Sequence, residues 1–152
     1  MGSRPKGKIR HIAISVPDPW KAAKFYEEIF GLERVGETHS KYADGVYLTD
    51  GTVNLALLKY NSDEGAGPER GKDYVGAHHI GFWIDDFDKV KADAEARGGK
   101  YWMGDPAASY EVKFRDADNC IFDVSLGGWP GAREGDAPES TASKEKAQQK
   151  AD

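Results

Sequence analysis

Residues 76–86 read Gly-Ala-His-His-Ile-Gly-Phe-Trp-Ile-Asp-Asp, and an earlier stretch, residues 11–18, reads His-Ile-Ala-Ile-Ser-Val-Pro-Asp. When the two stretches are aligned, His79 falls on His11, which is 68 residues earlier in the chain. The same offset places Gly99 on Gly31. A similarity that continues at one fixed offset indicates an internal duplication, so we predict two copies of one structural module.

Both copies alternate large apolar residues with small or polar ones, which is the pattern of a strand with one buried face. The apolar positions that share a face are Ile12, Ile14 and Val16 in the first copy and Ile80, Phe82 and Ile84 in the second. His11 and His79 therefore occupy equivalent places on the opposite face. A pair of metal-ligand-type side chains related by a duplication is the strongest indication of function in this sequence.

Composition limits the classes of protein to which the chain can belong. Its 152 residues, 39% of them apolar, suffice for about one domain with a core, built here from two half-size modules. A net charge of −5 without a basic cluster argues against nucleic acid or an anionic membrane as a partner. No apolar run is long enough to span a bilayer, and residues 1–10 lack a signal peptide. The single cysteine, Cys120, excludes an intrachain disulfide, so we expect a cytoplasmic protein.

The first module, residues 9–60, is predicted to have the order βαβββ. A strand over 9–16 leads to a helix that Asp18 caps and Gly31 ends. Three more strands are expected at 33–39, 45–49 and 52–59, the last two joined by a tight turn at Asp50-Gly51. Residues 61–77 form a polar, glycine-rich connection.

The second module, residues 78–129, is predicted to repeat this order. Its elements are a strand over 77–84, a helix between Asp85 or Asp86 and Gly98-Gly99, and strands near 100–103, 111–115 and 120–126. Residues 1–8 are polar, and residues 130–152 contain no large apolar residue. We expect a flexible N-terminus and a disordered tail, because neither end can bury a core.

The last strand of each module adds an oxygen-bearing side chain to the histidine face. Alternation places Asn54 in strand 52–58 and Asp123 in strand 120–126 on the face that carries His11 and His79. Two imidazoles and a carboxylate form a ligand set for a divalent transition metal, which an amide oxygen or water could complete. Nitrogen and oxygen donors without thiolate indicate Fe, Mn, Co, Ni or Zn. Asn54 is either a fourth ligand or an ordinary polar strand residue.

Three further residues near this set have weaker indications. His78 has the opposite parity to its neighbour His79, so we expect it to face away from the site in a structural role. Lys113 and Arg115 fall on the inner-face parity and could hold an anionic substrate, although solvent-exposed positions at strand edges are commoner for such residues.

Four segments, taken in order, resemble the vicinal oxygen chelate superfamily, which includes glyoxalase I, methylmalonyl-CoA epimerase, extradiol dioxygenases, and fosfomycin- and bleomycin-resistance proteins. They are His11-Ile12-Ala13-Ile14, Phe25-Tyr26 with Gly31-Leu32 after it, His78-His79-Ile80-Gly81-Phe82, and Phe114-Arg115-Asp116-Ala117-Asp118-Asn119-Cys120-Ile121-Phe122-Asp123. The last segment is similar to the family pattern F-x-D-P-D-G-N-x-x-E. The resemblance covers about residues 9–128.

The resemblance implies an α+β fold in which two tandem βαβββ modules form a cup-shaped mixed sheet. It also implies metal ligands on the first and last strands, which are His11, His79 and Asp123 here. Asp123 stands where the family usually has the longer glutamate. Asn54 stands where glyoxalase I has a second ligating glutamate and where the epimerase has glutamine. An amide cannot take a proton, which argues against a true glyoxalase I.

We therefore expect a metal-dependent enzyme whose small-molecule substrate chelates the metal through two neighbouring oxygens. The first expectation is a glyoxalase-like lyase or isomerase, in which the metal stabilises an enolate and Asp123 is the catalytic residue. An extradiol-type Fe(II) dioxygenase is the second, since two histidines and one carboxylate leave room for a bidentate substrate. The third is a metal-free protein that sequesters a small toxic molecule, although such a cup does not need this ligand set.

We also expect a homodimer, because half-size modules have open sheet edges that can pair with another module. The 17-residue connection, residues 61–77, allows the two modules to pair within one chain or across a two-fold axis. In the second arrangement His11 of one chain would meet His79 of the other. The sequence leaves both arrangements open.

Overall fold

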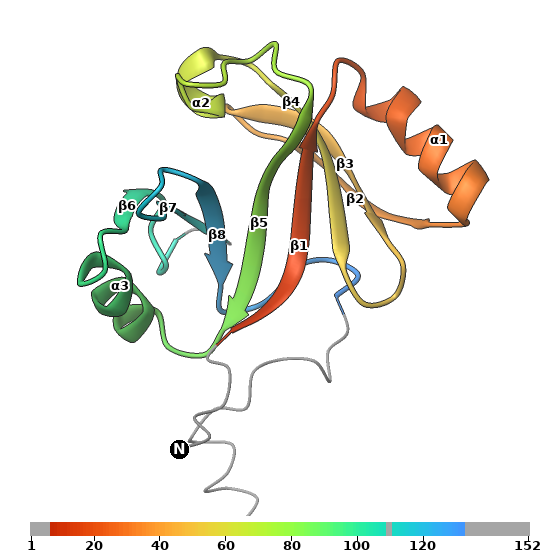
Figure 1. The fold of residues 1–152 in the computed structure, drawn as a ribbon. Coiled ribbons are helices and arrows are strands. Elements are labelled where there is room, and N and C mark those ends of the chain that lie inside the picture. The colour runs from red at the N-terminus through yellow and green to blue at the C-terminus, as the bar shows by residue number, and fades with distance from the viewer. Residues whose placement is uncertain (1–6, 109–110, 133–152) are drawn as a thin grey trace, which may run out of the picture.

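The computed structural model describes residues 7–108 and 111–132, and within these ranges the order βαβββ occurs twice (Figure 1). The first module comprises β1 (Gly7–Ser15), α1 (Pro19–Phe30), β2 (Glu33–His39), β3 (Ala43–Thr49) and β4 (Asn54–Tyr60). The second comprises β5 (Gly76–Ile84), α3 (Phe87–Glu95), β6 (Lys100–Met103), β7 (Val112–Arg115) and β8 (Ile121–Ser125). The connection holds one short helix that the sequence did not predict, α2 (Asp63–Ala66).

The ends of α1 show why its boundaries could be predicted. The Asp18 carboxylate accepts hydrogen bonds from the backbone amides of Trp20 and Lys21, both at 3.1 Å. These bonds satisfy two of the amides that the first turn of a helix leaves without an intrahelical acceptor. Gly31 takes the left-handed conformation at φ +68°, which ends the helix at little steric cost.

The two modules form one mixed sheet of eight strands in the order β2-β3-β4-β1-β5-β8-β7-β6. Antiparallel pairing of β1 with β5 joins the modules, and each of these strands also pairs in parallel with the last strand of its own module. This confirms the predicted α+β fold of tandem βαβββ modules. In this structure the two modules pair within one chain.

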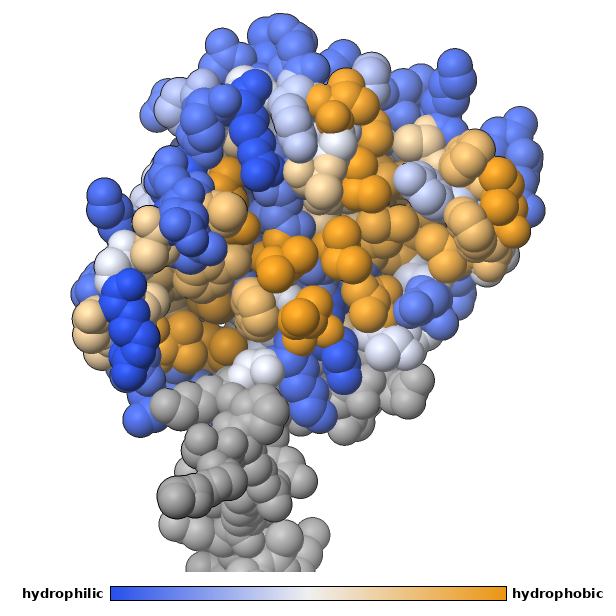
Figure 2. Space-filling view, in the orientation of Figure 1, coloured by the Kyte–Doolittle hydropathy of each residue, from blue (hydrophilic) through white to orange (hydrophobic). Residues whose placement is uncertain are grey.

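The helices cover only the flanks of the sheet. The α1 helix packs on β3 and β4, and α3 packs on β6 (Figure 1). The outer face of the central strands therefore exposes Ile9, Ile12 and Ile80, and Figure 2 shows apolar side chains gathered across this face. The strand face that the alternation predicted to be buried is thus covered by helices at the flanks and exposed at the centre.

The described structure extends beyond both predicted boundaries of the folded domain. Gly7 and Lys8 already belong to β1, where they pair with the end of β5. After β8, the Pro130 carbonyl accepts a hydrogen bond from Asn54 Nδ2 at 2.8 Å, and the Gly131 carbonyl accepts one from Thr49 Oγ1 at 2.9 Å. A tail boundary at residue 130 is therefore too early, because this segment docks on the first module. The rest of the two predicted flexible ends, residues 1–6 and 133–152, lies outside the described residues.

Within the described ranges no helix is both long enough and apolar enough to cross a membrane.

Candidate metal centre

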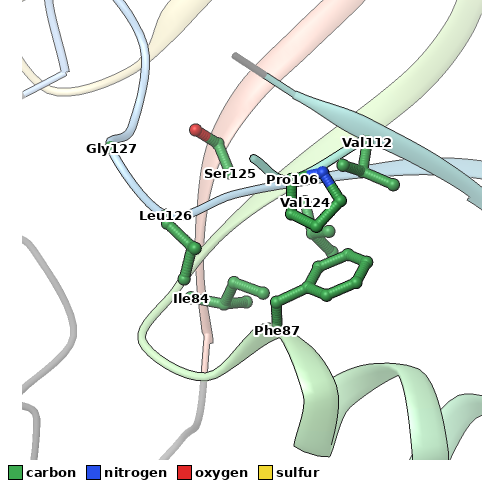
Figure 3. A pocket seen from close by; sticks show the side chains of 8 residues that line it. All are labelled: Ile84, Phe87, Pro106, Val112, Val124, Ser125, Leu126 and Gly127. Atoms are coloured by element: carbon green, nitrogen blue, oxygen red, sulfur yellow. The ribbon is translucent and has the colours of Figure 1, made fainter. Parts of the chain in front are cut away.

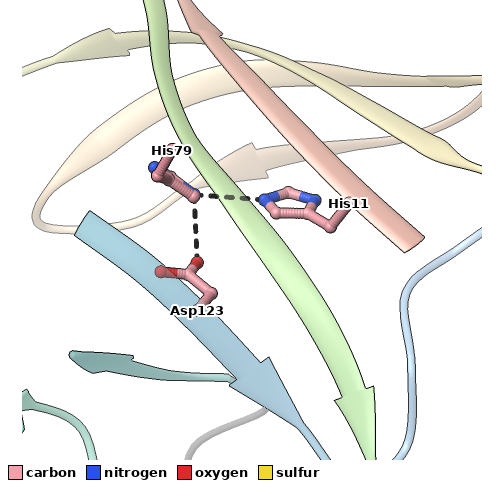
Figure 4. Close-up of side chains that lie close together, drawn as sticks. All are labelled: His11, His79 and Asp123. Carbon is pink, nitrogen blue, oxygen red and sulfur yellow. Dashed lines mark hydrogen bonds and ion pairs between the residues drawn. The ribbon is translucent and has the colours of Figure 1, made fainter. Parts of the chain in front are cut away.

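His11 of β1, His79 of β5 and Asp123 of β8 come together on the inner face of the sheet, as the sequence predicted (Figure 4). Their candidate ligand atoms all lie within 4.8 Å of one another, and all three side chains are buried. The Nε2 atoms of the two histidines are 3.2 Å apart, and His79 Nε2 is 3.0 Å from Asp123 Oδ2.

Strand register explains how three distant residues meet. His11 lies opposite Gly81 in the β1–β5 pair, and Gly81 lies opposite Asp123 in the β5–β8 pair. Gly81 therefore stands between the two ligands and leaves room for their side chains. A Cβ at Gly81 would lie 2.8 Å from His11 Cβ and 2.8 Å from the Trp129 ring, closer than real contacts allow. Only glycine fits this position.

Asn54 fixes which nitrogen of His11 carries the proton. Its Nδ2 group donates to the Pro130 carbonyl at 2.8 Å, which turns its Oδ1 atom toward His11 Nδ1 at 2.7 Å. A carbonyl oxygen can only accept, so His11 Nδ1 carries a hydrogen and its Nε2 is the nitrogen that faces His79. Asn54 thus lies behind His11 and holds it, and its amide does not join the three converging atoms as the predicted fourth ligand.

His78 contacts the Nδ1 atom of His79 and holds that ring, contrary to the expectation that His78 would face away from the site. In the β1–β5 register Ala13 lies opposite His79 and Ile14 opposite Ala77, so His78 is the extra residue of a β-bulge. A bulge interrupts strict alternation, and His78 consequently points inward with its neighbour. Its Nδ1 atom lies 2.8 Å from His79 Nδ1, and its Nε2 atom lies 2.6 Å from the Ala66 carbonyl.

These contacts determine the tautomers of both rings. The Ala66 carbonyl can only accept, so His78 Nε2 donates to it and His78 Nδ1 is left as an acceptor. His79 Nδ1, at 2.8 Å, is closer to this acceptor than the Tyr60 hydroxyl, at 3.3 Å, and we assign the donated hydrogen to His79 Nδ1, which leaves a lone pair on Nε2 of the neutral ring. Burial lowers the pKa of His78 to about 4, and burial also lowers the pKa of His79 well below its usual value, so both rings are neutral at pH 7.

Two imidazole nitrogens and a carboxylate oxygen therefore converge at one buried point. Three such acceptor atoms repel one another unless a proton or a metal cation lies between them. Neutral imidazoles and a carboxylate are the donors that Fe, Mn, Co, Ni and Zn accept, and the 3.0 and 3.2 Å separations suit neighbouring ligands of one such ion. The residues present thus fit a divalent transition metal.

Lys113 supplies a positive charge next to this point. Its Nζ atom donates to both oxygens of Asp123, at 2.9 and 2.8 Å, across the β7–β8 pair. It also lies 3.9 Å from Glu111 Oε1. Burial alone would lower the pKa of Lys113, but the charges of Asp123 and Glu111 outweigh burial and raise it, so the ammonium stays charged.

Trp129, which follows β8, closes the site on the side of the first module. Its ring stacks on that of His11, with centroids 4.8 Å apart and planes 7° from parallel. Its Nε1 atom donates to Glu111 Oε2 at 2.7 Å. The buried indole thereby keeps water from one face of His11 and orients a carboxylate.

A cavity of about 300 Å³ lies beside Lys113 and draws its walls from both modules. The lining residues are Thr38, Ser40, Tyr42, Tyr47, Met103, Gly104, Glu111 and Lys113. Residues from β3 and β7, which are far apart in the strand order, face the same space because the sheet curves around it. This curvature gives the predicted cup, and the cavity is the natural place for a small substrate.

A second cavity, of about 190 Å³, lies between the sheet and α3 (Figure 3). Its walls include Ile84, Phe87, Val112, Val124 and Leu126, and none of its lining residues is titratable. It is therefore a gap in the apolar packing of the second module, and its lining residues include no acid, base or metal-ligating side chain.

Of the two basic residues singled out in the sequence, only Lys113 reaches the site. Arg115 instead forms an ion pair with Glu69 and lies over the Trp102 ring, 4.3 Å from its centroid. Sequence reasoning missed Glu111, although it shares the parity of Lys113 in the same segment and that signal could have identified it. No sequence pattern pointed to Trp129.

Comparison with known proteins agrees with this architecture. A model of the family described as the Glyoxalase/Bleomycin resistance protein/Dioxygenase superfamily matches residues 8–122, which include His11 and His79 and end one residue before Asp123. No curated protein sequence matches the chain.

Solved structures with the same fold are distant in sequence. A hypothetical protein from Bacillus halodurans C-125 is 19% identical, with a TM-score of 0.64 over 78% of this chain and 93% of the other. A Streptomyces coelicolor methylmalonyl-CoA epimerase in complex with 2-nitronate-propionyl-CoA is 21% identical, with a TM-score of 0.66 over 80% and 96%. The methylmalonyl-CoA epimerase from Mycobacterium tuberculosis is 16% identical, with a TM-score of 0.63 over 82% and 91%. At these identities the likeness establishes the fold alone.

Proposed function

The chain belongs to the Glyoxalase/Bleomycin resistance protein/Dioxygenase superfamily, and we propose that it is a metal-dependent lyase or isomerase of the glyoxalase-like type. Its substrate is a small molecule that presents two neighbouring oxygens to the metal. One observation carries the proposal: ligand atoms of His11, His79 and Asp123 lie within 4.8 Å of one another at a buried point, and Asn54 and His78 contact the Nδ1 atoms of the two histidines. The epimerases among the similar structures support the isomerase class.

Each residue of the site has a distinct part in this proposal. His11, His79 and Asp123 hold the ion, while Asn54 and His78 fix the tautomers of the two imidazoles. When bound, a divalent metal supplies Lewis-acid chemistry that polarises neighbouring substrate oxygens and stabilises an enolate.

Proton transfer is assigned to Glu111 rather than to Asp123. Both oxygens of Asp123 already accept hydrogen bonds from Lys113, and one of them faces His79. Glu111 lines the cavity and its Oε2 atom accepts from the Trp129 indole, so we assign the substrate proton to Oε1, which lies 3.9 Å from the Lys113 ammonium.

Elemental analysis of protein purified without a chelator tests the metal site. We expect one transition-metal ion per chain, lost in His11→Ala and in His79→Ala. Full metal content in either variant would overturn the assignment. Deuterium uptake from D₂O into 2-oxo and 2-hydroxy acids tests the chemistry, and Glu111→Gln should abolish uptake while metal content is retained.

An extradiol-type Fe(II) dioxygenase is the second candidate, and the position of Asn54 favours it. Because the Asn54 amide is engaged by His11 and Pro130, the chain contributes two histidines and one carboxylate, the facial set of non-haem iron oxygenases. Oxygen consumption by the Fe(II)-loaded protein with catechols distinguishes the two candidates. Ring cleavage would support the dioxygenase, and proton exchange without oxygen uptake would support the isomerase.

We also propose that a second copy of the chain covers the outer face of β1 and β5. Ile9, Ile12 and Ile80 are 51%, 37% and 41% exposed there, and contiguous apolar surface of this kind marks an interaction site. Light scattering should show a dimer that Ile12→Glu dissociates. Val75→Glu changes a residue that is 60% exposed in the loop before β5, outside the paired strands, and is the control. A monomeric wild type would contradict the proposal.

A cytoplasmic location is proposed on a separate observation. Cys120 is free and exposed, a state that a reducing compartment preserves. Fractionation of cells followed by detection of the chain would test it.

A further inference from the structure

Lys113 belongs to the candidate metal centre and to the cavity at the same time. Its Nζ atom binds both oxygens of Asp123, and the same side chain lines the cavity of about 300 Å³. Asp123 Oδ2, which faces His79 Nε2 at 3.0 Å, is also only 2.8 Å from Lys113. One carboxylate oxygen is therefore shared between an ammonium and the point where a metal would sit.

The side chains around the candidate metal position do not sum to zero charge. Lys113 offsets one of the two nearby carboxylates, Asp123 and Glu111, and leaves one negative charge. A divalent cation held by His11, His79 and Asp123 reverses that sum to one positive charge. The ammonium and the ion would then lie against the same carboxylate, and their like charges repel, so the ammonium opposes the ion. A negative group in the cavity would relieve this repulsion.

We propose that Lys113 couples the two ligands of this site, so that an anionic group of the substrate, a carboxylate, binds beside Lys113 and strengthens metal binding. The inference rests on the proposed metal site and adds a substrate class, small carboxylic acids. Coupling between two ligands is reciprocal, so the metal strengthens binding of the anion by the same factor. Without the metal, Glu111 and Asp123 repel an anion from this cavity.

The cavity wall agrees with a ligand that is charged at one end. Lys113 and Glu111 lie at one part of the lining, and Tyr42, Tyr47 and Met103 supply apolar surface for a short carbon skeleton. Thr38 and Ser40 offer hydroxyl groups to a polar substituent. A volume of about 300 Å³ is at the lower end of small-molecule pockets, which suits an acid of a few carbons.

Cobalt(II) affinity, measured by chelator competition, tests the coupling. Lys113→Met should bind cobalt about tenfold more tightly than the wild type, within the usual range of coupling energies. Lys113→Arg retains the charge and should remain near the wild type. Lys24→Met alters a lysine whose side chain is 74% exposed on α1, so it should change nothing.

Propionate and its neutral isostere propionamide provide a second measurement that needs only the wild type. Propionate should tighten cobalt binding severalfold, propionamide should not, and the propionate effect should vanish in Lys113→Met. If the wild type binds cobalt but neither Lys113→Met nor propionate changes the affinity, the coupling is wrong and the metal site stands. If neither protein binds cobalt, the proposed metal site fails and the coupling fails with it.

Discussion

The two modules place the same pair of residue types, a histidine and an Asx residue, on equivalent strands and use them differently. In the first module His11 lies directly opposite Asn54, whose amide reaches the Nδ1 side of the ring at 2.7 Å. In the second, Asp123 lies opposite Gly81, two residues beyond His79, and reaches the Nε2 side at 3.0 Å. A change in strand register thus separates Asn54, which contacts the outer nitrogen of its histidine, from Asp123, which belongs to the candidate ligand set.

The second module fills the orienting role in another way. His78, the bulged residue of β5, takes the place beside His79 Nδ1 that Asn54 takes beside His11 Nδ1. Each module therefore has a residue that contacts the Nδ1 side of its histidine. It is an asparagine, Asn54, in the first module and a histidine, His78, in the second. Packing differs as well, because α1 buries Ala23 against β3 and β4 whereas α3 has no buried residue and leaves a cavity beneath it.

The largest expected effect comes from exchanging the two Asx side chains. Asp123→Asn removes the only charged ligand, so metal affinity should fall by about 100-fold or more. Asn54→Asp adds a charge on the far side of His11 and does not create a ligand, so it should not restore affinity when combined with Asp123→Asn. Isothermal titration with zinc measures both. Full recovery in the double variant would show that the modules are interchangeable after all.

Loss of His78 or of Asn54 should lower the metal affinity less than loss of Asp123, and by similar amounts. His78→Leu and Asn54→Leu each remove the acceptor of a ligand's Nδ1 hydrogen, so the zinc affinity should fall by about 10–100-fold. His78→Asn keeps an acceptor for His79 and a donor for the Ala66 carbonyl, and it should recover most of the affinity. If His78→Leu binds zinc like the wild type, His78 is an ordinary core residue.

The free energy of unfolding should fall in acid because His78, in the second module, is buried as a neutral ring. The pKa of His78 is about 4 in the folded protein and 6.5 ordinarily, so the unfolded chain binds more protons between these values. Its contribution to the free energy of unfolding is complete above pH 6.5 and is lost as the pH falls toward 4, by up to about 3 kcal/mol. Urea titrations of metal-free protein at pH 7 and pH 4.5 measure the loss, which should be smaller in His78→Asn. An equal loss in both proteins would contradict this assignment.

The smallest effect concerns two residues that the repeat aligns, Ala13 and Gly81. Gly81→Ala places a methyl group against His11 and Trp129 and should lower the free energy of unfolding by about 2 kcal/mol. Ala13→Gly, in the first module, should cost about 1 kcal/mol or less. Thermal denaturation compares the stability of the two variants. A Gly81→Ala protein as stable as the wild type would refute the close approach of Gly81 to His11 and Trp129.

Much of this structure was accessible from the sequence. The repeat and the strict alternation predicted the tandem modules, and they placed His11, His79 and Asp123 on one face. Strand register was not accessible, because alternation tells which face a side chain occupies and not which residue lies opposite. The sequence therefore could not tell that Asn54 would reach the outer nitrogen of His11 and Asp123 the inner nitrogen of His79.

Two other features escaped for related reasons. Parity assigned His78 to the wrong face because a single bulge in β5 breaks the alternation locally. Composition assigned residues from 130 onward to a tail, since Pro130 and Gly131 carry no large apolar group. They dock through backbone carbonyls, which every residue has and which no sequence pattern reveals.

The central claim is that His11 and His79 both carry hydrogen on Nδ1 and present bare Nε2 atoms to one cation. Long-range proton–nitrogen correlation NMR of the metal-free protein at pH 7 reports this directly for each ring. We predict the Nδ1–H tautomer for His11 and His79 and the Nε2–H tautomer for His78. Zinc at one equivalent should shift the Nε2 signals of His11 and His79 together. An Nε2–H tautomer on either ligand, or Nε2 signals that zinc leaves unmoved, would contradict the account.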